Sequence, residues 1–111
     1  MDSVINYPVL IRSVFEEYGQ ILSQVEEKRV ECIYDDANGH YEILWMGWEG
    51  SRRIHGCVVH VDLIDGKIWI QYDGTERGVA NDFVDAGVPK DRIVLGFQSP
   101  AKRPYTDFAS E

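Results

Sequence analysis

Two apolar runs joined by Asp65-Gly66 constrain the fold of this chain more than any other stretch. Both runs are rich in β-branched residues, and Asp-Gly tolerates the positive φ angles that a tight type I′ hairpin requires. The pattern predicts one strand that ends at Ile64 and a second over residues 67–72. Because a two-residue turn reverses the chain, these strands must pair antiparallel.

A helix is predicted directly after this hairpin, over residues 75–87. Thr75 is the candidate N-cap, and Glu76 stands where the positive end of a helix dipole favours an anion. An apolar stripe at steps of 3 and 4 would face the core, and it consists of Val79, Ala80, Phe83 and Val84. Gly87 is placed to close the helix, and Pro89 cannot continue it.

The N-terminal region carries a second helical pattern, over residues 7–26. Apolar side chains recur there at alternating steps of 4 and 3, namely Tyr7, Ile11, Val14, Tyr18, Ile21 and Val25, with Leu10 and Leu22 beside them. Pro8 is tolerated in the first turn, where its missing N–H has no partner to lose. Because the repeat lasts less than three heptads, it favours a core-facing helix over a coiled-coil dimer.

Residues 29–72, between the two helices, are predicted to form a meander of four strands. Asn38-Gly39 is a second type I′ signal, and the third strand, over 52–64, is long enough to require a bend near Gly56. Short loops between consecutive strands predict antiparallel pairing throughout.

The predicted fold class is therefore α+β, in a single domain over residues 1–111. Its order is an N-terminal helix, a four-stranded antiparallel meander, a C-terminal helix, and a hook and extended tail over residues 88–111. The buried run 93–97 is a short strand or an extended segment, so the sheet could hold five strands. Both helices should cover the same face of that sheet.

The charge balance restricts the partners of this chain. It has 111 residues, enough for one hydrophobic core, with 11 basic and 19 acidic side chains and a net charge of −8. Such a protein repels a phosphate backbone, so direct DNA binding by the isolated chain is disfavoured. Cys32 and Cys57 lie on predicted strands and are expected as buried thiols in a reducing cytoplasm. Without a signal sequence or an apolar span, no membrane association is expected.

The strand after Asn38-Gly39 is apolar on both faces. Tyr41, Ile43 and Trp45 point one way, and Leu44, Met46 and Trp48 point the other. In the fourth strand, Ile68, Ile70 and Tyr72 are expected to oppose Lys67, Trp69 and Gln71. Since helices cover one face, the second apolar face needs another cover. That cover is the tail, through Tyr105 and Phe108, or a second copy, or a different protein.

The acids near the hairpin form the most enzyme-like cluster: His60, Asp62, Asp65, Asp73 and Glu76. Acids so arranged could hold a hard cation for hydrolysis, but turn and capping roles account for most of them. A structural hydrogen bond explains the His60 and Asp62 pair more simply than proton transfer does. We therefore predict no enzyme, and no catalytic, cofactor or metal residue. A metal-dependent hydrolase using Asp62, Asp65 and Asp73 is the alternative.

Partner contacts are predicted at exposed aromatic and arginine positions, because Trp, Tyr and Arg are over-represented at interface hot spots. The candidates are Trp48, Arg53, Trp69, Tyr105 and Phe108. The three histidines are scattered along the sequence, and neither a CxxC motif nor a phosphate-binding loop is present.

Four strings in order resemble the XisI family: HYEILWMGW, GKIWIQYDGT, GVPKDRIVLGF and RPYTDFA. This family contains the fdxN element excision controlling factors of filamentous photosynthetic bacteria. The resemblance implies a non-catalytic accessory protein that controls excision of a DNA element during heterocyst development. It also implies a XisH-type partner, which is similar to restriction-endonuclease-like nucleases. The inhibitor half of a nuclease pair, in the manner of a toxin and its antidote, is a further alternative.

Overall fold

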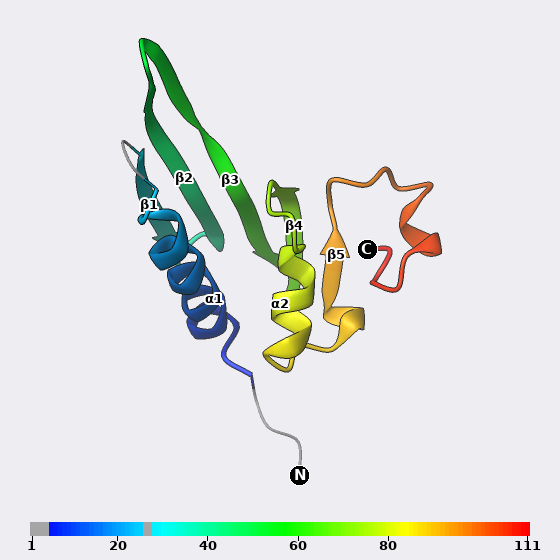
Figure 1. The fold of residues 1–111 in the computed structure, drawn as a ribbon. Coiled ribbons are helices and arrows are strands. Elements are labelled where there is room, and N and C mark those ends of the chain that lie inside the picture. Colours follow the sequence, from blue (N-terminus) through cyan, green and yellow to red (C-terminus); the bar gives the residue numbers. More distant parts are fainter. Residues whose placement is uncertain (1–4, 26–27) are drawn as a thin grey trace.

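A single sheet with two helices on one face forms this α+β protein (Figure 1). The computed structural model describes residues 5–25 and 28–111. The helices are α1 (Tyr7–Leu22) and α2 (Val79–Asp85). The strands are β1 (Lys28–Asp35), β2 (His40–Glu49), β3 (Arg52–Ile64), β4 (Lys67–Asp73) and β5 (Ile93–Leu95), and they lie side by side in that order.

The direction of β5 makes the sheet mixed. Strands β1 to β4 form the predicted antiparallel meander. In contrast, β5 pairs parallel with β4, with Ile93 beside Ile68 and Leu95 beside Ile70. The fifth strand exists, but the expectation of a wholly antiparallel sheet is wrong. The reason is that the chain crosses over through α2 before it re-enters the sheet, which returns it in the direction of β4.

Only one of the two predicted type I′ turns is formed. Asp65 and Gly66 have φ angles of 50° and 76°, as that turn requires. Between β1 and β2, only Gly39 has a positive φ, and the connection is a four-residue loop. The carboxylate of Asp35 accepts hydrogen bonds from the Asn38 backbone N–H at 3.1 Å and side-chain amide at 2.9 Å. This capping by Asp35 stabilises the longer loop.

Helix α1 is shorter than predicted. It begins after Asn6, whose side-chain oxygen accepts a hydrogen bond from the Val9 N–H at 3.2 Å, and it ends at Leu22 instead of residue 26. Residue 26 itself lies outside the described residues. Because β1 begins at Lys28, the chain has to leave the helix early, and Ile21 remains exposed.

The buried face of α1 consists of Ile11, Val14, Phe15 and Tyr18. Packing of these residues on the sheet agrees with a core-facing helix. Phe15 was absent from the predicted stripe, although it lies one helical turn after Ile11.

Helix α2 begins four residues later than predicted. The Asp73 carboxylate accepts hydrogen bonds from the Thr75 backbone at 2.9 Å and from the Val79 N–H at 2.8 Å. Thr75 therefore lies in an Asx turn and is not the N-cap, and Glu76 is exposed ahead of the helix. Gly78, with φ 87°, occupies the N-cap position, and this conformation excludes the preceding loop from the helix.

The C-terminal end of α2 has the predicted closure. Gly87 takes φ 107°, and the Val88 N–H donates to the Phe83 carbonyl at 3.0 Å. This six-to-one hydrogen bond is the Schellman arrangement that glycine at C′ favours. It directs the chain toward β5.

A β-bulge in β3 lies close to the predicted bend. Ile43 pairs with Val59 and Leu44 pairs with Cys57, so Val58 is the extra residue. The irregularity is thus two residues after Gly56, the position expected from sequence.

A second bulge changes the face on which Tyr72 lies. Ile70 pairs with Val61, but Tyr72 pairs with His60, so Gln71 is the extra residue. Tyr72 is 51% exposed, whereas Ile70 is fully buried. The prediction that Tyr72 shares a face with Ile70 is therefore wrong, because the bulge interrupts strict alternation.

The hydrophobic core lies between the two helices and one face of the sheet. Its fully buried side chains include Ile11, Phe15, Tyr41, Ile43, Val59, Val61, Ile68, Ile70, Phe83 and Ile93. Among the described residues, no helix has the length and apolar character that crossing a membrane demands. Cys32 and Cys57 lie on β1 and β3 as predicted, but both are only partly buried.

Candidate functional site

The candidate site lies on the sheet face opposite α1 and α2, which we call the open face. Strand register and alternation assign to it Leu44, Met46, Trp48, Arg53, Cys57, His60, Asp62, Trp69 and Tyr72. Within the described residues, neither helix packs on this face (Figure 1). Trp48 is 48% exposed, and Tyr72 is also on the surface. Large aromatic side chains in such positions are typical of interaction surfaces.

One end of the open face is an arm formed by residues 48–57 of the β2–β3 hairpin, which extends beyond the neighbouring strands (Figure 1). Among the described residues, β1 reaches only Gly47, and β4 pairs with β3 only as far as Val59. Trp48 and Arg53 face each other on the arm, and the guanidinium carbon lies 5.2 Å from the indole ring centroid. The structure thus brings these two predicted contact residues together.

The other three predicted contact residues lie elsewhere, near the tail. The guanidinium of Arg103 lies 5.1 Å from the Trp69 ring centroid, so the tail covers part of this indole. Phe108 is partly buried against the core, and the next residue, Ala109, donates its N–H to the Ile93 carbonyl at 2.9 Å. These contacts place the tail beside β5.

Tyr105 does not cover the sheet. Its side chain is 90% exposed, so of the three alternatives for the cover, the tail does not supply it through Tyr105. The short helical turn over Arg103–Tyr105 projects this ring outward. Because the tail lies at the β5 edge, it leaves the arm end of the open face uncovered within the described chain (Figure 1).

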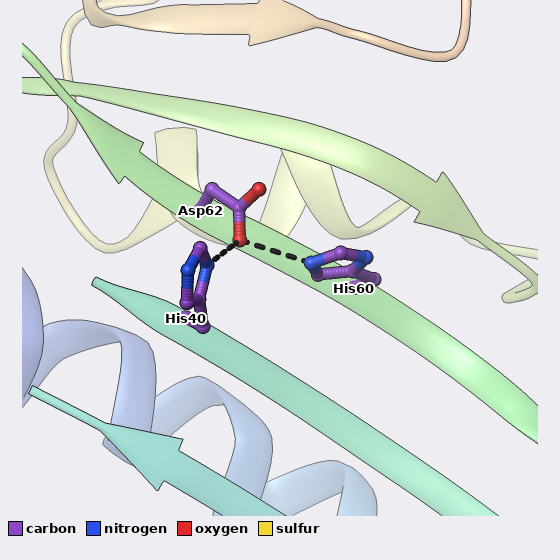
Figure 2. Close-up of side chains that lie close together, drawn as sticks. All are labelled: His40, His60 and Asp62. Atoms are coloured by element: carbon purple, nitrogen blue, oxygen red, sulfur yellow. Dashed lines mark hydrogen bonds and ion pairs between the residues drawn. The ribbon is translucent and has the colours of Figure 1, made fainter. Parts of the chain in front are cut away.

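Between the arm and the tail, two histidines converge on one carboxylate (Figure 2). Asp62 Oδ1 lies 2.7 Å from His40 Nδ1 and 2.9 Å from His60 Nε2. The Gln71 amide donates to the other carboxylate oxygen, Oδ2, at 3.2 Å. The side chain of Asp62 is nearly buried, whereas that of His40 is 57% exposed. The cluster is therefore anchored in the sheet and open to solvent on one side.

Sequence reasoning paired His60 with Asp62 but missed His40. The signal that could have found His40 is strand register, since His40 on β2 lies directly opposite Asp62 on β3. The remaining acids of the predicted cluster lie apart from this group. Asp65 forms the hairpin turn, and Asp73 is engaged by Thr75 and Val79. Within the described chain, the only group of three with metal-ligating reach is His40, His60 and Asp62.

Mutual interaction shifts the pKa values in this cluster. The hydrogen bond to Asp62 and its negative charge raise the pKa of His40 above its ordinary value of 6.5. Burial acts to raise the pKa of Asp62, but hydrogen bonds from His40 and His60 outweigh burial and lower it below 3.8. The ion pair between protonated His40 and ionised Asp62 is thus favoured in the folded state.

Replacing His40 with glutamine is expected to destabilise the protein in a pH-dependent way. The raised pKa of His40 stabilises the fold fully below pH 6.5, and this contribution is lost as pH rises through the folded value. The lowered pKa of Asp62 contributes above pH 3.8 and is lost as pH falls through its folded value. The difference in unfolding free energy between the wild type and His40→Gln should therefore be largest between about pH 4 and 6.5.

Urea unfolding of both proteins across pH 3 to 9, with a chelator present, measures this difference. A difference in unfolding free energy that does not vary with pH would show that the His40–Asp62 ion pair does not contribute. His55→Gln is the matched control, since the third histidine lies on β3 outside the cluster.

A family model and two crystal structures similar to this chain all belong to XisI or XisI-like proteins. A family model described as XisI protein matches residues 1–110. The crystal structure of a XisI-like protein from Anabaena variabilis superposes with a TM-score of 0.86 at 40% identity, covering 93% of this chain and 94% of that one. The fdxN element excision controlling factor XisI from the same organism gives a TM-score of 0.81 at 29% identity, covering 95% and 96%. A search of curated proteins found no match.

Proposed function

Because this chain belongs to the XisI family, we propose that it is a regulatory protein that controls excision of a DNA element by binding another protein. The name of the Anabaena variabilis relative, an excision controlling factor, supports the regulatory role. In this proposal the chain performs no catalysis. Its setting is element excision during heterocyst development, as the family resemblance implies.

The observation that carries this proposal is the uncovered arm of the open face. Trp48 and Arg53 lie on a hairpin whose two strands have few neighbours, so both side chains are accessible. A half-exposed indole with a stacked guanidinium is characteristic of an interface hot spot. Met46 and Leu44 continue the apolar surface from the arm toward the centre of the sheet.

We further propose that the partner is a XisH-type, nuclease-like protein. A nuclease binds DNA through an electropositive groove, and a protein of net charge −8 is attracted to such a surface. The same charge opposes direct contact with the phosphate backbone. The proposed complex would therefore position or restrain the nuclease while this chain itself does not contact DNA.

Coexpression with the XisH-type protein encoded nearest to this chain tests the proposal. Light scattering on a sizing column should show this chain shifting quantitatively into a mixed complex, and the complex should differ from the free partner in DNA cleavage. Added salt should weaken the complex, because it screens the attraction between this acidic chain and an electropositive partner. Separate elution at micromolar concentrations and low salt would contradict the hetero-complex, and a stable dimer of this chain alone would assign the open face to a second copy.

A further inference from the structure

Two neighbouring strands place the same pair of residue types on the open face. β2 contributes His40 and Glu42 at positions i and i+2, and β3 contributes His60 and Asp62 with the same spacing. Because the strands are antiparallel, His40 lies opposite Asp62, and Glu42 lies opposite His60. Two imidazoles and two carboxylates therefore alternate at four neighbouring positions on adjacent strands.

Three of these side chains already converge. One ligand atom from each of His40, His60 and Asp62 lies within 4.8 Å of the others, and both rings approach the same carboxylate oxygen (Figure 2). Metal-ligand bonds of about 2.0 to 2.2 Å in tetrahedral geometry need ligand atoms roughly 3.3 to 3.6 Å apart. The distances from Asp62 Oδ1 to His40 and His60, 2.7 and 2.9 Å, would each have to lengthen by less than about 1 Å, and both imidazoles are partly exposed, so side-chain rotation can supply this change.

We propose that His40, His60 and Asp62 form a binding site for a divalent transition-metal ion of the zinc class. Two imidazole nitrogens and one carboxylate oxygen are ligands that suit zinc, cobalt or iron, whereas calcium and magnesium prefer oxygen alone. Solvent exposure of His40 leaves room for water at the fourth position, and Asp35 and Glu42 are the neighbouring carboxylates by register. This inference is independent of the proposed function.

The surroundings of the three ligands favour a cation. The Gln71 amide fixes Asp62 through the oxygen that the histidines do not use, which is the role of a second-shell partner in metal sites. Asp35 lies opposite His40 on β1, and Glu42 lies opposite His60. With Asp62, three carboxylates thus surround the two imidazoles, which bind a metal in their neutral form.

Titration of the metal-stripped full chain tests this site. Calorimetric titration with zinc chloride should give one zinc ion bound per chain. Titration with cobalt(II) should produce the visible absorption bands of a four-coordinate ion with nitrogen ligands. His60→Ala and Asp62→Asn should each weaken zinc binding by about 100-fold or more, because loss even of a second-shell partner costs about 10- to 100-fold. Gln71→Leu should weaken it by about tenfold.

Two further variants keep the test decisive if Asp62→Asn fails to fold. His40→Ala removes an exposed ligand and should abolish the cobalt bands while far-UV circular dichroism stays that of the wild type. His55→Ala, outside the cluster, should bind zinc like the wild type. Binding that survives in His40→Ala, or that is lost equally in His55→Ala, would overturn the assignment. Absence of one-to-one binding by the wild type would leave the cluster as a hydrogen-bonded structural feature only.

Discussion

Replacing Phe15 with alanine is expected to lower the free energy of unfolding by about 3 to 5 kcal/mol. The Phe15 side chain is fully buried, and its ring packs 6.3 Å from that of Tyr34 between α1 and the sheet. Truncation removes that packing and leaves a cavity that a sheet and helix cannot close. For a domain of this size the melting temperature should fall by about 12 °C or more. Since small domains are stable by only about 5 to 15 kcal/mol, this loss is a large fraction of the total stability.

Val9→Ala is the matched control for this experiment. Val9 lies on the same helix, but its side chain is 60% exposed, so its truncation should change the unfolding free energy by no more than about 0.5 kcal/mol. Urea unfolding followed by circular dichroism measures both variants. If Phe15→Ala costs less than about 1 kcal/mol, α1 does not pack on the sheet in the described way.

Replacing Trp48 with alanine is expected to weaken the proposed complex with the XisH-type protein by about 30-fold or more. Truncation of a central interface tryptophan typically costs about 2 kcal/mol or more of binding free energy, and each 1.4 kcal/mol is about tenfold in Kd. In the free chain, Trp48 is half-exposed and stacks on Arg53, so its loss should cost less than about 1 kcal/mol of stability. Calorimetric titration of the folded variant separates these two effects.

Ile21→Ala provides the comparison. Ile21 is also an exposed apolar side chain, at 58% against 48% for Trp48, but it lies on α1, on the opposite side of the sheet from Trp48. Its truncation should leave the Kd unchanged. Equal losses for Ile21→Ala and Trp48→Ala would show that the partner does not recognise the arm, and no loss for Trp48→Ala would move the interface to another surface.

Only part of the candidate site could be predicted from the sequence, because its third residue is brought in by strand register. His60 and Asp62 are two residues apart on one strand, so their proximity could be read from alternation alone. His40 joins them because β2 pairs with β3 in one register, and the bulge at Val58 shifts that register along the hairpin. Alternation cannot locate a bulge, and the same limitation placed Tyr72 on the wrong face.

Local chemistry was sufficient wherever one or two residues decide the backbone conformation. The Asp65-Gly66 turn, the Gly87 helix end and the bounds of β3 are read directly from the sequence, because positive φ angles and alternation act over a few residues. The start of α2 and the parallel direction of β5 could not be read from the sequence in this way. The start depends on which backbone groups the Asp73 side chain binds, and the direction depends on where the crossover returns the chain. The start of α2 is a local competition between an Asx turn and a helix, which helix propensity alone does not rank, whereas the direction of β5 depends on contacts distant in sequence.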